Sequence, residues 1–460
     1  VAYPHGTHVN NPMPAEDNAP AWEALQRAQA AAPGLSLREQ AYIRALGTRY
    51  EAEPRDDRAP LDRAFANAMR EFVRAYPDDL DAQVFFAEAL MNTMPWDYWT
   101  KDRAPKPETE EVLAALRFVR ERNPDHPGAN HFYIHAVEAG PQPELGVDAA
   151  DRLLRFAPGA GHLVHMPAHI YMRVGRYEDA VTANVLAVKA DELYLRRLRA
   201  QGFYPGVYYP HNIHFLWYAL AYDGRSREAL KTAEKAAEYA LDNWCGPSKA
   251  LEAPRLRHLP WITAARFGRW DEVLRVPQPA VTNDFLVDRA MWHFARGLAF
   301  AARGDAAKAG AEHALLAELA ASDAARALDI PAFPASATLA VADHWLAGRV
   351  AAARGDWPAA IRLLEQAVEA EAALPYMEPA YWPFPARPAL GAVLLAAGEP
   401  ARAEAVFRAD LAQWPRNAWG LFGLEQSLRA QGRGDAAVLV GREFQAAWLR
   451  ADTRLDLAWF

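Results

Sequence analysis

The sequence predicts an all-α fold made of stacked helical hairpins, and three observations lead to this expectation. A short motif with a turn glycine, a polar residue and often an aromatic residue returns along the chain at intervals close to the length of a helical hairpin. Runs of β-branched residues are few, while alanine, leucine, arginine and glutamate dominate, and all four favour helices. Hydrophobic residues make up 52% of the chain and charged residues 23%, which is typical of a globular protein.

The turn motif is clearest at Val174-Gly175-Arg176-Tyr177, which is followed by Ala180. It returns with its central glycine at Gly224, Gly268, Gly304, Gly355, Gly398 and Gly432. We expect each of these glycines to take the left-handed conformation that ends one helix, and the small alanine to let the next helix pack closely. A second glycine stands seven residues before the turn in three copies, at Gly297, Gly348 and Gly391.

These residues resemble the tetratricopeptide repeat, a helix-turn-helix unit of 34 residues. The resemblance covers most of the chain, from about Asp81 to Trp448. It implies a right-handed α-solenoid of about nine or ten hairpins, in which the first helices line a concave groove. On this basis we expect an N-terminal helical cap over residues 1–80, histidine-rich repeats over 81–275 and C-terminal repeats over 276–460.

Three segments interrupt the repeat period. They are an aromatic loop over residues 95–107, an insertion over 202–210, and a loop rich in proline and tryptophan over 374–388. Long ordered insertions are often lids or binding loops, and the alternative is that these segments cap the edges of helices. The opening segment, residues 6–12, is loop-like and either folds back over the groove or frays.

Histidines recur at equivalent positions of successive hairpins. Eight of the fourteen histidines fall on such positions, at His131, His135, His162, His165, His169, His211, His214 and His258. Three of them lie 13, 10 and 6 residues before Gly175, and two keep the first two of these offsets before Gly224. In the repeat that this chain resembles, these offsets belong to the first helix, on the face that looks into the groove. The histidine ladder therefore predicts a functional site.

Spacings of three, four and seven residues place side chains on one face of a helix. Neighbouring helices lie about 8–10 Å apart. Imidazoles from adjacent hairpins can therefore meet at one or two metal ions, with metal–nitrogen bonds of about 2.0–2.1 Å. Pro167 leaves two alternatives, because it either starts its helix late or kinks it. Either outcome turns His162 and His165 relative to His169.

We assign roles to the residues of this region from their place along the predicted helices. The predicted metal ligands are His135, His162, His165, His169 and His214. The predicted catalytic residues, as outer ligands, proton shuttles or a general base, are Glu138, His131, His211 and Tyr209. The predicted substrate-binding residues are Tyr204, Tyr208, Arg255, His258 and Trp96. Arg255 is included because a guanidinium group can bind a substrate carboxylate.

The ligand chemistry narrows the choice of metal without identifying it. Cys245 is the only cysteine, which excludes a thiolate cluster and an internal disulfide. Calcium and magnesium prefer oxygen ligands, and the carboxylates of this region are few, namely Glu138, Glu88 and Asp97. A site dominated by histidine suits copper, iron or zinc.

The sequence therefore predicts a metal-dependent enzyme that acts on a small organic molecule in the groove. Redox chemistry with copper or iron is the first interpretation, and hydrolysis assisted by zinc is the second. The competing class is a tetratricopeptide scaffold whose groove binds a peptide or a partner protein, and a metal-storage or metal-delivery protein is a further alternative. Walker A, G-x-S-x-G, H-E-x-x-H and dinucleotide-binding motifs are missing from the sequence.

Charge and composition bear on partners and location. The formal charge of −8 argues against a nucleic-acid partner, because phosphate binding needs a basic face. No run of about 18 apolar residues predicts a membrane span. The chain starts at Val1 and looks processed or trimmed, so that a leader or further repeats are expected to precede it. We expect a soluble protein of the cytoplasm or the periplasm.

Overall fold

The computed structural model describes residues 2–241, 255–330 and 333–460, so that Cys245 lies outside the described residues. Within these ranges every regular element is a helix, apart from isolated bridges such as the one between His8 and Asn11. The predicted all-α class is confirmed. The chain divides into two compact units, Val1–Ala157 and Pro158–Phe460, and each is described by itself. The division into three segments expected from the sequence stays a prediction.

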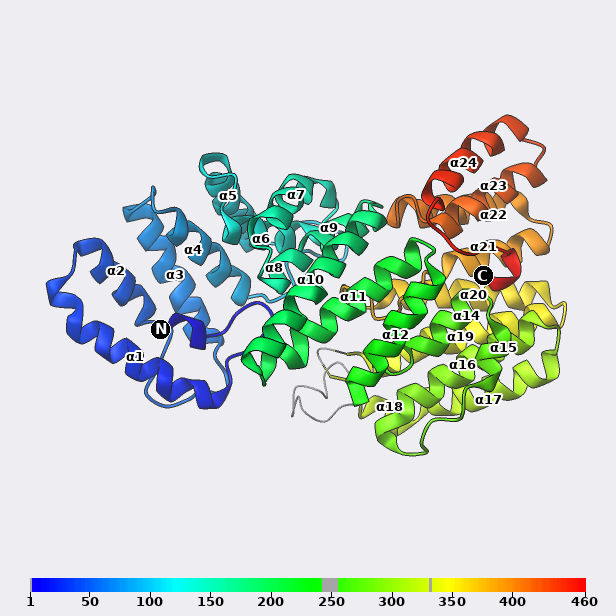
Figure 1. The fold of residues 1–460 in the computed structure, drawn as a ribbon, viewed down its shortest axis with the longest axis horizontal. Coiled ribbons are helices and arrows are strands. Elements are labelled where there is room, and N and C mark those ends of the chain that lie inside the picture. Colours follow the sequence, from blue (N-terminus) through cyan, green and yellow to red (C-terminus); the bar gives the residue numbers. More distant parts are fainter. Residues whose placement is uncertain (1, 242–254, 331–332) are drawn as a thin grey trace. The chain divides into compact units, whose positions relative to one another are not determined.

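The first unit is a series of helices in which each packs on the next (Figure 1). Its helices are α1 (Asn18–Ala31), α2 (Leu37–Leu46), α3 (Ala59–Ala75), α4 (Leu80–Asn92), α5 (Pro107–Arg122), α6 (Pro127–Glu138) and α7 (Val147–Phe156). Helix α3 shows why they stack: Phe65, Met69, Phe72 and Val73 recur at helical spacing and are all buried. Such an apolar stripe requires a neighbouring helix to cover it.

The opening segment packs into the core of the first unit, which excludes the expectation that it frays. The hydroxyl of Tyr50 donates to the carbonyl of Ala2 over 2.7 Å, and the side-chain amide of Asn92 donates to the carbonyl of Thr7 over 3.1 Å. Gly6 makes the closest approach, since a Cβ there would lie 2.5 Å from Nε of Arg49. The segment is therefore packed and does not fray.

The aromatic loop over residues 95–107 covers the edge of helix α6. The indole nitrogen of Trp99 donates to the carbonyl of Ala136 over 2.9 Å, and Tyr98 is buried. Gly140 allows this contact, because a Cβ at that position would lie 2.7 Å from the Trp99 ring. For this segment the structure supports the expectation that an insertion caps a helix edge.

The second unit begins with α8 (Gly161–His165), α9 (Pro167–Arg173) and α10 (Tyr177–Leu198). The insertion expected over residues 202–210 is mostly helical, because the π-helical turn η5 (Tyr204–Tyr208) runs directly into α11 (Tyr209–Tyr222). The remaining helices are α12 (Ser226–Leu241), α14 (Leu259–Arg266), α15 (Trp270–Arg275), α16 (Leu286–Ala302), α17 (Ala306–Ala321), α18 (Asp323–Arg326), α19 (Ala335–Ala353), α20 (Trp357–Ala373), α21 (Arg387–Ala396), α22 (Pro400–Gln413), α23 (Ala418–Ala430) and α24 (Gly434–Ala447).

The hairpin turns carry the backbone conformation that the sequence predicts. All seven turn glycines have a positive φ between 65° and 80°. The earlier glycine in three of the hairpins has a different role, which is close packing between helices. A Cβ at Gly348 would lie 2.6 Å from Leu364 on the following helix, and one at Gly391 would lie 2.5 Å from Phe407. The helical hairpins and their glycines confirm the expected tetratricopeptide-like architecture.

The second unit curls until the loop before α23 and the segment after α24 contact the turns of its first hairpins (Figure 1). The hydroxyl of Tyr177, just after the first turn, donates to the carbonyl of Pro415 over 2.9 Å. The hydroxyl of Ser226, after the second turn, donates to Asp452 over 2.6 Å, and Arg450 binds Asp223 at 2.8 Å. These contacts join residues more than 220 positions apart and fix the curvature of the inner face.

The loop between α20 and α21, residues 374–386, lies across the inner faces of earlier helices of the same unit. The rings of Trp382 and Phe294 lie 5.2 Å apart, and the rings of Phe384 and Trp217 lie 5.7 Å apart. Arg255 holds the middle of the loop, because its Nη2 donates to the carbonyl of Pro379 over 2.7 Å. The loop thus covers part of the face that the repeat resemblance assigns to the groove.

Among the described helices, none combines the length and the apolar character that crossing a lipid bilayer requires.

Candidate metal centre and adjoining pocket

Two predicted ligands meet in the second unit across a proline that divides their helix. Helix α8 ends at His165, Met166 follows, and α9 begins at Pro167, where a missing backbone N–H is tolerated. Across this break the Nε2 atoms of His165 and His169 lie 2.9 Å apart, and the two rings are nearly perpendicular at 74°. Both alternatives for Pro167 thus apply in part, since it ends one short helix and starts the next.

Asn184 on α10 fixes the tautomer of His165. The side-chain amide nitrogen of Asn184 donates to the carbonyl of Ala180 over 2.8 Å, so that its oxygen must be the atom facing His165. That oxygen lies 2.7 Å from Nδ1 of His165, and an amide oxygen only accepts. Nδ1 therefore carries the proton, and Nε2 presents a lone pair toward His169. Asn184 is fully buried, so that this orientation is held by its surroundings.

His211 on α11 completes the group. Its ring centroid lies 4.8 Å from that of His165 and 5.8 Å from that of His169. One nitrogen from each of the three residues lies within 4.8 Å of the others. Burial holds the pKa of His211 well below its usual value, and the neighbouring charges of His165, His169 and Arg255 lower it further. His211 is therefore a neutral imidazole, the form that binds a metal.

An apolar ring shields the three histidines. The Phe215 ring lies 4.6 Å from both His165 and His169, and Phe215 is fully buried. His165 and His169 are buried as well, whereas His211 is only half-buried. The arrangement is a largely dry group with one more open side, which suits an ion whose remaining positions can exchange ligands.

A buried carboxylate supports the helices that carry this group. Asp191 on α10 accepts from the hydroxyl of Tyr204 and from the side-chain amide of Asn212, each over 2.7 Å. Gly161 lies against it, and a Cβ there would fall 1.8 Å from Oδ1 of Asp191. Burial raises the pKa of Asp191, while the two hydrogen bonds oppose that rise. Tyr204, predicted to bind substrate, thus directs its hydroxyl to a supporting residue.

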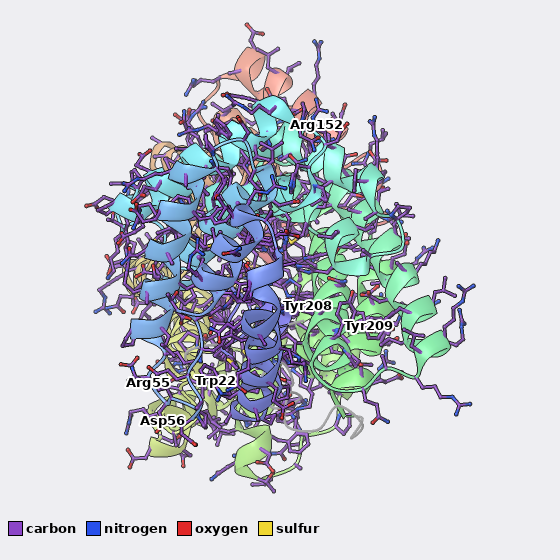
Figure 2. The ribbon with its side chains drawn as sticks, turned by 90° about the vertical axis from the view of Figure 1, so that its left-hand side faces the viewer. Trp22, Arg55, Asp56, Arg152, Tyr208 and Tyr209 are labelled. Carbon is purple, nitrogen blue, oxygen red and sulfur yellow. The ribbon has the colours of Figure 1, made fainter. Side chains whose placement is uncertain are left out.

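The other predicted residues of this stretch lie around the group. The His162 ring lies 6.1 Å from that of His165 and 4.4 Å from that of Tyr208. Tyr208 and Tyr209 lie next to each other where η5 joins α11 (Figure 2). The hydroxyl of Tyr209, a predicted catalytic group, donates to Glu192 over 3.2 Å.

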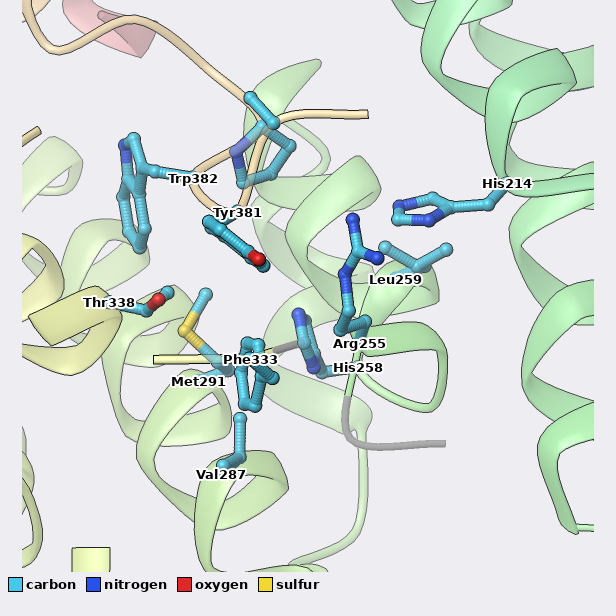
Figure 3. Close-up of a pocket in the computed structure, with 12 residues that line it drawn as sticks. His214, Arg255, His258, Leu259, Val287, Met291, Phe333, Thr338, Tyr381 and Trp382 are labelled. Carbon is cyan, nitrogen blue, oxygen red and sulfur yellow. The ribbon is translucent and has the colours of Figure 1, made fainter. Parts of the chain in front are cut away.

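The structure places His214 apart from the group of His165, His169 and His211, although the sequence ranked it among the metal ligands. Its ring stacks on Trp217 with centroids 5.5 Å apart. It lines a pocket together with Arg255 and His258, both predicted to bind substrate (Figure 3). Burial lowers the pKa of His214 well below its usual value, and the Arg255 cation and His258 add to the effect.

The pocket has a polar end and an apolar remainder. Figure 3 shows the Arg255 guanidinium between the rings of Tyr381 and His214, and its carbon lies 5.3 Å from the Tyr381 centroid. The apolar walls come from α14, α16, the segment before α19 and the loop over 374–386. The residues that line them are Leu259, Val287, Met291, Phe333, Ala380, Trp382 and Pro383.

The first unit holds the remaining predicted residues. Nδ1 of His135 lies 2.8 Å from a carboxylate oxygen of Glu138, and both side chains are almost fully buried. The Trp96 ring meets His135 edge-on at 4.9 Å, and the His131 ring lies at the same distance from it. The structure therefore brings His131, His135 and Glu138 together, as their spacing of three and four residues predicts, and Trp96 from the aromatic loop joins them.

Sequence reasoning missed Asn184 and Asp191, which lie on the second helix of their hairpin. The repeat pattern directs attention to first helices, because these line the groove. One feature of the sequence could have found them, because an asparagine and an aspartate interrupt an otherwise apolar face of α10. Buried polar residues of this kind require partners, and here the partners are site residues and their neighbours.

Comparison with known proteins finds a distant structural likeness. No protein-family model matches the chain, and no curated protein matches it significantly. The human IFIT1 dimer with m7Gppp-AAAA shares 12% identity over 95% of this chain and 87% of that chain, with a TM-score of 0.36. A Rap protein complexed with competence and sporulation factor shares 11% identity over 95% and 99% of the two chains, with a TM-score of 0.32. The chain is a tetratricopeptide-like helical-repeat protein with buried histidine groups.

Proposed function

We propose that the second unit binds a transition-metal ion through His165, His169 and His211, and that the protein is a metal-dependent enzyme acting on a small organic molecule. The observation that carries this proposal is the tautomer of His165. Because Nδ1–H is committed to Asn184, Nε2 of His165 can act only as an acceptor or a ligand. Orienting a ligand histidine through its other nitrogen is the usual second-shell arrangement of metal sites.

The spacing of the ligand atoms supports copper or iron. Two nitrogens bound at about 2.05 Å lie roughly 2.9 Å apart when the angle at the metal is near 90°, and about 3.4 Å apart in a tetrahedral site. The observed 2.9 Å between His165 and His169 matches the smaller angle. Tetragonal and octahedral sites of nitrogen and oxygen ligands are typical of copper and iron, whose chemistry is oxidation and reduction. Zinc prefers a tetrahedral site with the larger nitrogen–nitrogen distance, so hydrolysis assisted by zinc is the second candidate.

Three protein ligands leave coordination positions for water or substrate. This is the arrangement of a catalytic site, whereas a purely structural ion is usually enclosed by four ligands. His211 is the only half-buried residue of the three, so a substrate would approach on its side. The bound ion would supply Lewis acidity or electron transfer, and the surrounding residues would orient the substrate and exclude water.

The test is elemental analysis of protein purified without a histidine tag under a native metal supply. We expect the unsubstituted protein to carry about one equivalent of copper, iron or zinc in the second unit's site. His165→Ala and His169→Ala should each lose this metal and keep the helical circular dichroism signal. A matched control is His214→Gln, which changes a buried histidine three residues from His211 but outside the group. It should retain the metal. The metal found then selects oxygen consumption or ester and amide hydrolysis as the activity screen.

A hydrogen-bonded histidine pair in a peptide-binding scaffold is the alternative account. In that case His169 donates to His165, and no stoichiometric metal binds at this position. The enzyme proposal ends if the purified protein carries well below one equivalent of metal and does not take up added Cu²⁺, Fe²⁺ or Zn²⁺. The scaffold account then holds, and His169→Ala should leave the metal content unchanged.

A further inference from the structure

The opening segment of the first unit, residues 2–12, is held by side chains that bind its main chain. The hydroxyl of Tyr50 donates to the carbonyl of Ala2 over 2.7 Å, and the side-chain amide of Asn92 donates to the carbonyl of Thr7 over 3.1 Å. Every residue of a peptide carries such a carbonyl, so these donors fix the path of the segment without depending on the identity of its side chains.

Tyr3 anchors the segment. Its ring lies 4.7 Å from that of Phe85 on α4 and 6.1 Å from that of Phe65 on α3. Its hydroxyl donates to the carboxylate of Glu88, which is 5% exposed. A tyrosine buries a large apolar ring and makes a hydrogen bond at its tip, and tyrosines are therefore enriched among the residues that dominate binding energy. The surface that the segment covers thus recognises a phenol at this position.

Gly6 is required at its position because a side chain has no space there. Its backbone is extended, with φ −80° and ψ 176°, a conformation that any residue can adopt. A Cβ there would lie 2.5 Å from Nε of Arg49 and 2.6 Å from the hydroxyl of Tyr50. Arg49 is 1% exposed, and its guanidinium carbon lies 4.5 Å from the centre of the Tyr3 ring and 4.9 Å from that of Phe65, so it cannot easily move aside. The segment therefore presents the pattern Tyr-x-x-Gly to a surface that fits it.

Arg49 and Asn92 hold hydrogen-bonding capacity that the segment does not use. Arg49 donates through Nη2 to the carbonyl of Thr7, whereas its Nε and Nη1 are buried without a hydrogen-bond partner among the described residues. The side-chain oxygen of Asn92 is likewise unpaired within that part of the chain. Native structures leave few buried polar atoms unpaired, so the segment covers this surface without satisfying it fully. Such a contact is easier to exchange for another peptide than one in which every donor is paired.

We infer that residues 2–12 act as a tethered peptide ligand of the first unit, and that the surface they cover binds a segment of another protein that carries the pattern Tyr-x-x-Gly. The inference rests on the side-chain donors that hold the main chain, on the phenol anchor and on the space that admits only glycine. A short flexible tether raises the effective concentration of its own ligand to about the millimolar range, so an external peptide competes only when the resident segment is released. This binding function belongs to the first unit and goes beyond the metal-dependent activity proposed for the second.

The first test measures whether the released surface binds the segment as a separate peptide. A chain that lacks residues 1–12 is titrated against a fluorescein-labelled synthetic peptide of residues 2–12, and binding is followed by fluorescence anisotropy. We expect saturable binding to this shortened chain and binding weaker by about tenfold or more to the full chain, where the resident segment occupies the surface. Peptides with Tyr3→Ala or Gly6→Ala should bind about tenfold more weakly or worse, because the anchor is lost or a methyl group clashes. The control is Pro12→Ala, which changes an exposed residue and should leave the affinity within about twofold.

Two tyrosines of the first unit provide a matched pair of variants on the protein side. Tyr50→Phe removes the donor to the carbonyl of Ala2 and keeps the ring, so peptide binding to the shortened chain should weaken about two- to tenfold. Tyr42→Phe removes a hydroxyl that donates over 3.0 Å to Asp79 and not to the segment, and peptide binding should not change. If Tyr50→Phe binds the peptide as tightly as Tyr42→Phe does, the inference that side-chain donors hold the main chain is wrong.

Circular dichroism of the shortened chain determines which protein decides the test. If this chain is folded and does not bind the peptide, or binds the Gly6→Ala peptide as tightly as the unsubstituted one, the inference is overturned. If it does not fold, the full chain with Tyr3→Ala takes its place, because loss of the anchor releases the segment while the segment itself stays present. This variant should bind the labelled peptide about tenfold more tightly than the unsubstituted full chain does, and equal binding would overturn the inference. The metal content should be the same in every variant, so this test is independent of the metal proposal.

Discussion

Replacing Asn184 with leucine is the sharpest test of how the metal site is organised. The side-chain oxygen of Asn184 accepts from Nδ1 of His165 over 2.7 Å, and its nitrogen donates to the carbonyl of Ala180 over 2.8 Å. Leucine has a similar volume and offers no acceptor. In Asn184→Leu the Nδ1–H of His165 is left facing an apolar group, and nothing holds the lone pair of Nε2 toward the metal position.

The expected magnitude follows from the two roles of this contact. Leaving a buried donor without a partner lowers the free energy of unfolding by about 1–3 kcal/mol. Loss of the outer partner of a metal-bound histidine weakens metal binding by roughly 10- to 100-fold. Asn184→Asp is the matched control, because a carboxylate still accepts from Nδ1 and keeps the same tautomer. This control should retain the metal, whereas Asn184→Leu should bind it more weakly.

Competition with a chelator of known affinity measures the metal dissociation constant of each variant. Thermal unfolding with and without added metal separates the loss of stability from the loss of binding, because a ligand raises the midpoint only when it binds the folded state. If Asn184→Leu binds the metal within about threefold of the unsubstituted chain, His165 is not a ligand through Nε2, and the reasoning from its tautomer is refuted.

Three further predictions follow from buried contacts of the second unit. Gly161→Ala places a methyl group against Asp191 and should lower stability by about 1–3 kcal/mol, seen as a shifted urea midpoint. Burial raises the pKa of Asp410 to about 7, so the folded state holds an extra proton between about pH 4 and 7, and stability falls as pH rises through this window. Urea unfolding at pH 5 and pH 8 should show that Asp410→Asn removes at most about 3 kcal/mol of this fall in stability, and an unchanged fall would show that Asp410 ionises normally. Phe384→Ala removes the ring that packs on Trp217 and should cost about 3 kcal/mol, with faster proteolytic cleavage of the loop over 374–386 as the second readout.

The helical hairpins were predictable because their signals are local. A glycine such as Gly355 must end a helix with a positive φ, and the neighbouring residues decide this without reference to the rest of the chain. Close packing at Gly348 and Gly391 was predictable for a similar reason, because the repeat places the same two helices against each other in every copy. Sequence periodicity thus contained most of the architecture.

The composition of the histidine group was predictable only in part. Spacing placed His165, His169 and His211 on neighbouring first helices, and the structure brings them together. The sequence placed His214 among the ligands and His211 among the catalytic residues, although both keep the offsets of the ladder. The structure groups His211 with His165 and His169, which depends on how α11 lies against α8 and α9 and not on spacing along one helix.

The loop over 374–386 shows a second limit of sequence reasoning. Its prolines and tryptophans indicated an ordered insertion, but not its position. That position depends on contacts with Trp217, Arg255 and Phe294, which lie about 80 to 170 residues earlier in the chain. Only the curled arrangement of the second unit brings these partners into reach, so the covered groove and the small pocket could not be foreseen.

One proton distinguishes the two accounts of the histidine pair. Asn184 fixes the proton of His165 on Nδ1, so the 2.9 Å contact with His169 has a single proton at most, and that proton must sit on Nε2 of His169. In a hydrogen-bonded scaffold the proton stays there, and His211 has no function in the contact. In a metal site it must leave, and three lone pairs then converge. Burial lowers the pKa of His211, so this histidine stays neutral beside the pair and offers the third lone pair that the metal account requires. A group built only for a hydrogen bond would need no third neutral imidazole next to it.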